Sequence, residues 1–186
     1  MLIENKVDFL KAYEMLSPSQ FMLLTELAKK NNLKLTGHVP LSINVEIASS
    51  SGLNSIEHFR NIELSMTKMT DDLLKERKAI LKNKSALRGA SLRSLLHNKQ
   101  RMRSIYNLDS SKIKNVVDIL AKNDTWQIPT LKLYKNFASK SYKSKQYDSY
   151  LNLLPKNIGE NWRKTISQLE DNEDKERMDF TKWQSS

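Results

Sequence analysis

Residues that could bind a metal stand at the ends of three short apolar segments. His38 and His58 each close one segment, and Lys11 lies near the end of a third, followed by Tyr13. Imidazole nitrogens are common ligands of transition metals, and ligands on adjacent strands can converge on one cation. Taken singly, a histidine at a strand end is commonly a structural hydrogen-bonding group, and a single lysine is commonly a surface residue. Together, Lys11, His38 and His58 predict a metal site.

The elements that must position these residues are parallel strands alternating with helices. The sequence Ser17-Pro18-Ser19-Gln20 predicts a helix that begins with a capping box, and a short helix over 43–50 ends at Gly52. Short connections between strands and helices are typical of a parallel sheet with helices packed outside it. The carboxyl ends of such strands meet at one edge, where active sites assemble. We predict strands at residues 7–13, 33–38, 53–58 and 125–130.

Alternation of side chains along a strand assigns the candidate residues to faces. Lys11 and Tyr13 should share one face of the first strand, so Tyr13 is a candidate for a substrate contact. By the same rule, His38 should share a face with Thr36, and His58 with Ile56. Each of the three strands therefore brings a polar side chain to its carboxyl end.

The order of the motifs resembles a known family. D-F-L-K-A-Y, G-H-V-P, G-L-N-S-I-E-H and T-W-Q-I-P-T-L follow one another as in the amidohydrolase superfamily, specifically its imidazolonepropionase-like and prolidase-like branch. The resemblance spans about residues 7–133 and implies an α/β fold, a partial (β/α)8 TIM-type barrel comprising the fourth to the seventh strand. It also implies that a carboxylated Lys11 and the two histidines His38 and His58 are ligands of a divalent metal, for which we expect zinc.

The resemblance implies a function as well. Family members hydrolyse a C–N bond, in an amide or cyclic amide, with metal-activated water, so a small amide or dipeptide-like substrate is expected. The family pattern also has an H-x-H pair and a strand-ending aspartate, which this sequence does not show. We therefore expect a central fragment of the barrel that is inactive alone, has no catalytic residue of its own and binds metal weakly. His97 lies outside the matching motifs, and we expect no role for it in the site.

Most of the positive charge lies in one stretch. The net charge is +10, and residues 73–103 contain ten basic residues and one acid. Such a run is usually a solvated helical face, and no aromatic residue interrupts it to stack on bases. We therefore expect no nucleic-acid partner. The alternatives to the enzyme are a basic module that binds nucleic acid or another anionic partner, and a catalytically dead remnant.

The chain is expected to form one domain, residues 1–186, with a basic helical insertion at about 66–108 and a helical segment at about 134–186. A partial barrel leaves strand edges unpaired, so we expect homo-oligomers. The sequence has no cysteine, no signal peptide pattern and no apolar run long enough for a membrane span. No membrane contact is expected, and the cytoplasm is the default location.

Overall fold

The structure, a computed structural model, describes residues 5–59, 61–83, 87–139 and 144–171. The chain divides after Pro129 into two compact units, residues 1–129 and 130–186. The first unit holds the sheet and all the candidate residues, and the second holds helices.

The first unit is built on a parallel sheet with the strand order β1-β2-β3-β4. Its strands are β1 (Phe9–Ala12), β2 (Lys34–Gly37), β3 (Ser55–Glu57) and β4 (Trp126–Ile128). The prediction of an α/β fold with four parallel strands is confirmed. Each strand is shorter than predicted. At the carboxyl ends of β2 and β3 the backbone leaves the extended conformation, with φ of 123° at Gly37 and 60° at His58.

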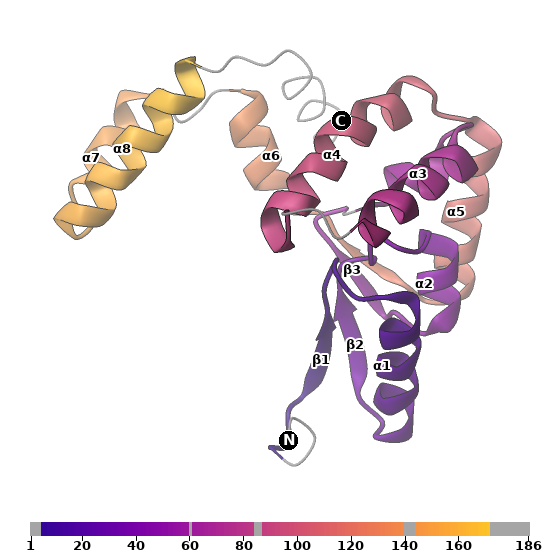
Figure 1. Ribbon diagram of the computed structural model, residues 1–186. Helices are drawn as coiled ribbons and strands as arrows, with labels where there is room; N and C mark the ends of the chain where they lie inside the picture. The colour runs from indigo at the N-terminus through magenta and orange to yellow at the C-terminus, as the bar shows by residue number, and fades with distance from the viewer. Residues whose placement is uncertain (1–4, 60, 84–86, 140–143, 172–186) are drawn as a thin grey trace. The chain divides into compact units, whose positions relative to one another are not determined.

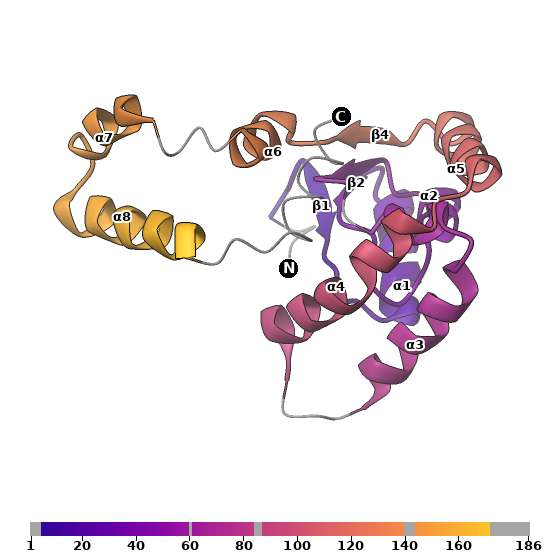
Figure 2. The ribbon, with the colours of Figure 1, turned by 90° about the horizontal axis from the view of Figure 1, so that it is seen from above.

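Helices α1 (Pro18–Lys30), α2 (Val45–Ser51) and α5 (Ser110–Lys122) lie on one side of the sheet (Figures 1 and 2). The predicted capping box of Ser17 and Gln20 begins α1, and Gly52 ends α2 in the left-handed conformation. Between these helices and the sheet lies the core, which includes the fully buried side chains Ala12, Phe21, Leu35, Ala48, Ile56 and Val116. Burial of such apolar side chains fixes the strands against the helices and thus fixes where each strand ends.

The opposite face of the sheet is open. Phe9 and Tyr13 are about half exposed, as is Ile128 on β4, and Trp126 on the same strand is about two thirds exposed. Leu10 and Ala12 are buried, so Lys11 lies on the open face with Phe9 and Tyr13, as alternation predicts. In this sheet β1 and β4 are the edge strands, and the homo-oligomers expected from open edges stay a prediction.

A helical excursion separates β3 from α5. It contains η1 (Glu63–Met66), α3 (Thr70–Lys82) and α4 (Gly89–Tyr106). An isolated antiparallel bridge between Thr67 and Leu108 joins the start of the segment that contains α3 and α4 to its end. A hydrogen bond from Lys68 N to Asn107 O supports this bridge. Figure 1 shows α3 and α4 beyond the carboxyl ends of the strands, so the excursion lies over the edge that carries the candidate residues.

The second unit contains α6 (Leu131–Ala138), α7 (Lys145–Leu151) and α8 (Lys156–Asp171). Residues 172–186, the end of the predicted helical segment, lie outside the described residues. Of the helices that the structure describes in either unit, none is both long and apolar enough to cross a membrane.

Candidate metal centre

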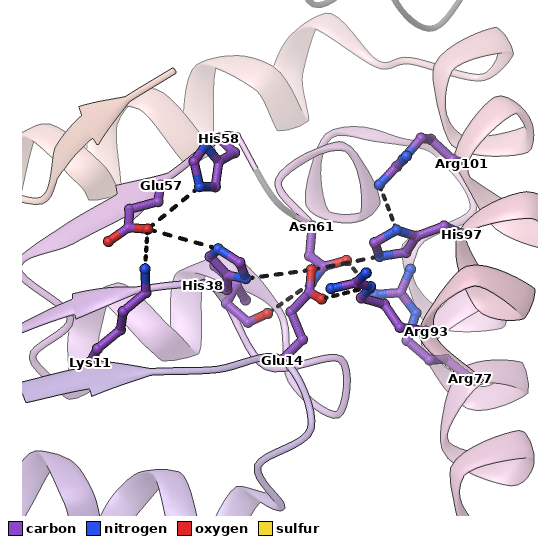
Figure 3. A network of polar contacts seen from close by, with 11 residues as sticks. Lys11, Glu14, His38, Glu57, His58, Asn61, Arg77, Arg93, His97 and Arg101 are labelled. Atoms are coloured by element: carbon purple, nitrogen blue, oxygen red, sulfur yellow. Dashed lines mark hydrogen bonds and ion pairs between the residues drawn. The ribbon is translucent and has the colours of Figure 1, made fainter. Parts of the chain in front are cut away.

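The predicted residues meet at the carboxyl edge of the sheet, around a residue that was not predicted. Lys11 comes from β1, His38 follows β2 directly, Glu57 is the last residue of β3, and His58 is the next residue (Figure 3). One ligand atom each from His38, Glu57 and His58 lies within 4.8 Å of the others. Lys11 points to the same place as a hydrogen-bond donor to Glu57.

The carboxylate of Glu57 is the centre of the cluster. Its Oε2 lies 2.6 Å from Nζ of Lys11, 3.5 Å from Nε2 of His58 and 3.9 Å from Nε2 of His38. Burial raises the pKa of Glu57, but the hydrogen bond and charge of Lys11 and the charges of both histidines outweigh it and leave the pKa below its usual value. Glu57 is therefore an ionised, half-buried carboxylate, which is the form that binds a cation.

The backbone after β3 explains why two neighbours, Glu57 and His58, both face the site. Alternation predicted that His58 shares a face with Ile56, and this was wrong. Ile56 is fully buried in the core, while His58 is about one third exposed beside Glu57. The chain adopts positive φ at His58, Phe59 and Asn61, a conformation that costs about 1–3 kcal/mol per non-glycine residue. The turn thus reverses the alternation and points His58 into the cluster.

Asn61 fixes this turn to the end of β2. Its Nδ2 donates to Val39 O at 2.8 Å, and its Oδ1 accepts from Nη1 of Arg77 at 3.3 Å. His38, which precedes Val39, is buried, and its ring lies 5.4 Å from the ring of His58 in a T-shaped arrangement. The two histidines are therefore held by one hydrogen-bonded framework.

Tyr13 lies beside the cluster. The centroid of its ring is 4.7 Å from that of His38, and the residue is about half exposed. A side chain that contacts a candidate ligand and also reaches solvent is placed to contact a bound small molecule. The substrate contact expected for Tyr13 stays a prediction.

Behind His38 lies a second carboxylate that the sequence did not reveal as a site residue. Glu14 is fully buried, and its Oε1 is 3.7 Å from Nδ1 of His38. From α4, Nε of Arg93 lies 3.5 Å from Oε2 of Glu14, and Nε2 of His97 lies 3.8 Å from Oε1 (Figure 3). His97, for which no role in the site was expected, thus lies beside the carboxylate that faces His38. The signal was present in the sequence, because Arg93, His97 and Arg101 are spaced by four and share one helix face.

The interpretation of the basic run as a solvated face holds only in part. Lys75, Lys78 and Lys82 are exposed. Arg77 is buried, and desolvation lowers its pKa to about 10 although the charges of Glu63 and Glu14 oppose this. Nε of Arg77 donates to Oε1 of Gln100 at 2.8 Å. Arginines of the run therefore turn inward, where they neutralise the buried carboxylates.

Comparison of the chain with protein-family models, with curated proteins and with solved structures yields no match. The site must therefore be interpreted from its own residues. Two histidines and one glutamate form a ligand set of catalytic zinc sites, in which the fourth position is left open. The ligand types in this cluster fit zinc, and the ammonium group of Lys11 is the group that competes with a cation for Glu57.

Proposed function

We propose that the first unit binds a divalent metal, zinc, through His38, Glu57 and His58, and that it is the metal-binding part of an amidohydrolase acting on a C–N bond. The observation that carries this proposal is the convergence of three ligand atoms within 4.8 Å at the carboxyl edge of a parallel sheet. Zinc bonds of about 2.0–2.2 Å in a tetrahedral site separate ligand atoms by about 3.4 Å. The distances from Glu57 to the two histidines, 3.5 Å and 3.9 Å, are close to that value.

The order of the strands supports the barrel. Doubly wound sheets reverse their strand order and carry helices on both faces, whereas a (β/α)8 barrel adds each strand beside the previous one and keeps its helices outside. Here the order is sequential, β1 to β4, and the crossover helices lie on one side. The open face of the sheet would then be the barrel interior. This arrangement agrees with the family resemblance, which supplies the reaction class.

Each residue at the edge has a part in this proposal. A bound divalent cation supplies Lewis-acid chemistry, which polarises a carbonyl and lowers the pKa of water. His38 and His58 are neutral ligands, and Glu57 contributes the negative charge that offsets the cation. Tyr13, exposed beside His38, contacts the substrate, which we expect to be a small amide or a dipeptide-like molecule.

Lys11 has one of two states in the proposed site. As an ammonium it is the counter-ion of Glu57, at 2.6 Å, and it opposes metal binding. As a carbamate it would carry a negative charge and become the further ligand that the family resemblance implies. We propose that the ammonium group loses a proton and that the resulting amine adds carbon dioxide and releases a second proton, which converts the first state into the second.

The first test is calorimetric titration of zinc into the chain near pH 8. We expect binding that is lost in the double variant His38→Ala/His58→Ala and retained in Asp72→Ala, which removes an exposed carboxylate of α3. Equal binding by the double variant would contradict the proposal. The remnant interpretation predicts no zinc uptake by the unchanged chain.

A second test concerns Lys11 and the fourth coordination position of the zinc ion, which the three protein ligands leave open. Bicarbonate should tighten zinc binding by the unchanged chain, whereas Lys11→Met should show no response to bicarbonate. A small hydroxamate, which binds zinc through two oxygens in place of an amide, should bind only when zinc is present. Hydroxamate binding to the zinc-free chain, or an equal response of Lys11→Met to bicarbonate, would argue against this assignment.

A further inference from the structure

We infer that Glu14 is a positioning residue of the metal centre, which holds the ring proton of His38 on Nδ1 and leaves Nε2 to bind the cation. This inference rests on the proposed metal site but concerns residues outside its ligand set. It also gives the helical excursion a function, because α4 supplies the groups that orient Glu14.

Both ring nitrogens of His38 face a carboxylate, but the two carboxylates differ. Glu14 is fully buried, whereas Oε2 of Glu57 already accepts a hydrogen bond from Nζ of Lys11, at 2.6 Å. Nδ1 faces Oε1 of Glu14 at 3.7 Å, and Nε2 faces Oε2 of Glu57 at 3.9 Å. A carboxylate only accepts hydrogen bonds, so a carboxylate behind Nδ1 stabilises the tautomer with the proton on that nitrogen. Metal-binding histidines commonly have such a carboxylate at the nitrogen remote from the metal, which fixes the tautomer and the orientation of the ring. Nε2, the nitrogen on the side of Glu57 and His58, is then the ligand.

The contacts of His97 on α4 determine which of its ring nitrogens carries the proton that faces Glu14. Nη2 of Arg101 lies 2.7 Å from Nδ1 of His97. A guanidinium can only donate, so Nδ1 of His97 accepts and its ring proton is on Nε2, the atom 3.8 Å from Oε1 of Glu14. Arg93 approaches the other oxygen of Glu14 at 3.5 Å. His97 and Arg93, which share one face of α4, thus orient the carboxylate of Glu14. The oxygen that faces His97, Oε1, also faces His38.

A role in packing alone does not account for Glu14. It is fully buried, and its neighbours Ala12 and Leu41 in the same part of the fold are buried apolar residues. The carbonyl of Glu14 accepts a hydrogen bond from Leu41 N at 2.8 Å, a contact that any residue at this position would make. Burial of a carboxylate is costly unless it is paired, and an apolar side chain avoids that cost. The contacts of the carboxylate itself therefore indicate its role.

The first experiment measures the tautomer directly in the metal-free chain. Nitrogen-15 NMR of the imidazoles, at a pH where His38 is neutral, should show His38 with its proton on Nδ1. In Glu14→Gln, which keeps the shape and removes the charge, the ring should shift toward a mixture of both tautomers. A residue with only a structural role would leave this ratio unchanged. An unchanged ratio, or a proton on Nε2 in the unaltered chain, would overturn the inference.

The second experiment measures zinc affinity with a matched control. Removal of a carboxylate that orients a histidine ligand commonly weakens metal binding by about 10- to 100-fold, and we expect this for Glu14→Gln. Glu76→Gln is the control, because Glu76 forms its ion pair with Nη1 of Arg103, at 2.7 Å, rather than with a ligand or with the residues that orient Glu14. Urea unfolding of both variants verifies that they remain folded. Equal affinities of the two variants would overturn the inference.

The outcomes separate this inference from the proposed function. If the unchanged chain binds no zinc, the proposed function fails, and the NMR measurement still decides whether Glu14 fixes the tautomer of His38. If zinc binds through His38 and His58 but Glu14→Gln changes neither affinity nor tautomer, the metal site stands and the inference about Glu14 is wrong.

Discussion

Gly37 offers a direct test of how the site is held, because this last residue of β2 pairs with Ala12 of β1 and directly precedes His38. Its φ is +123°, and a Cβ added there would lie 2.2 Å from O of Ala12 and 3.1 Å from N of Ala12. A carbon–oxygen contact normally needs about 3.3 Å, so Gly37→Ala must push β1 away by about 1 Å. The same carbonyl accepts the hydrogen bond from His38 N, at 3.1 Å.

The loss of stability in Gly37→Ala has three parts. The positive φ costs about 1–3 kcal/mol for a residue other than glycine. Weakening the hydrogen bond to Ala12 O costs about 1 kcal/mol. Overpacking against backbone, which cannot move away as a side chain can, costs about 1–3 kcal/mol. The three costs add to about 3–7 kcal/mol. We also expect weaker zinc binding, because His38 moves with the strand.

Gly52→Ala is the matched control. Gly52 has a φ of +114°, but a Cβ there would meet only the flexible end of Lys29, with Cε at 2.8 Å. The backbone strain is similar and the close approach to a strand is missing, so Gly52→Ala should lose about 2–4 kcal/mol less. With a urea dependence of about 2 kcal/mol per M, Gly37→Ala should unfold at a urea concentration about 1–2 M lower than the control, as measured by circular dichroism. Coincident midpoints would refute the reasoning.

Two further predictions concern the buried charges. Arg77→Ala should lower the free energy of unfolding by about 3–5 kcal/mol, because the side-chain oxygens of Asn61 and Gln100 lose the guanidinium that donates to them. The control Lys78→Ala, on the exposed face of α3, should change this free energy by less than about 0.5 kcal/mol. Urea titrations measure both values. Equal effects would contradict the buried role of Arg77. The pKa of Glu57 is lowered on folding, so its contribution to stability is complete above its usual pKa of 4.5 and is lost as the pH falls through the lower folded value. The stability difference between the unchanged chain and Glu57→Gln should therefore shrink as the pH falls from 7 to below 4.5, and a difference independent of pH would show that the carboxylate has no such role.

Local signals in the sequence were sufficient for the sheet and for part of the site. The strand positions follow from short apolar segments, and the start of α1 follows from Ser17 and Gln20, because these signals act within a few residues. The location of His38 and His58 at one edge follows from parallel pairing, which brings the carboxyl ends together. No long-range information was needed for these predictions.

The rest of the site depends on interactions that no local pattern contains. His58 faces Glu57 and His38 because its own backbone adopts a positive φ, which the residue types at 58 and 59 do not suggest. Glu14 and His97 meet because α4 lies over the carboxyl edge of the sheet, and they are far apart in the sequence. Spacing could have indicated that Arg93, His97 and Arg101 share a face, but it could not have indicated which face is turned inward.

The buried ion pairs of the arginines on α3 and α4 help to choose between a functional metal site and a catalytically dead remnant. Glu14 and Glu63 are both buried, and their cations come from α3 and α4, so the excess positive charge of the excursion serves partly to neutralise the interior. A buried ion pair is commonly no more stable than apolar residues of the same volume, and it is strongly destabilising when one partner is lost. A chain kept only for its packing would gain stability by replacing such a network with apolar side chains. Its presence beside His38 therefore supports a role in orienting that ligand, and the tautomer measurement on Glu14→Gln tests this role without requiring the chain to be catalytically complete.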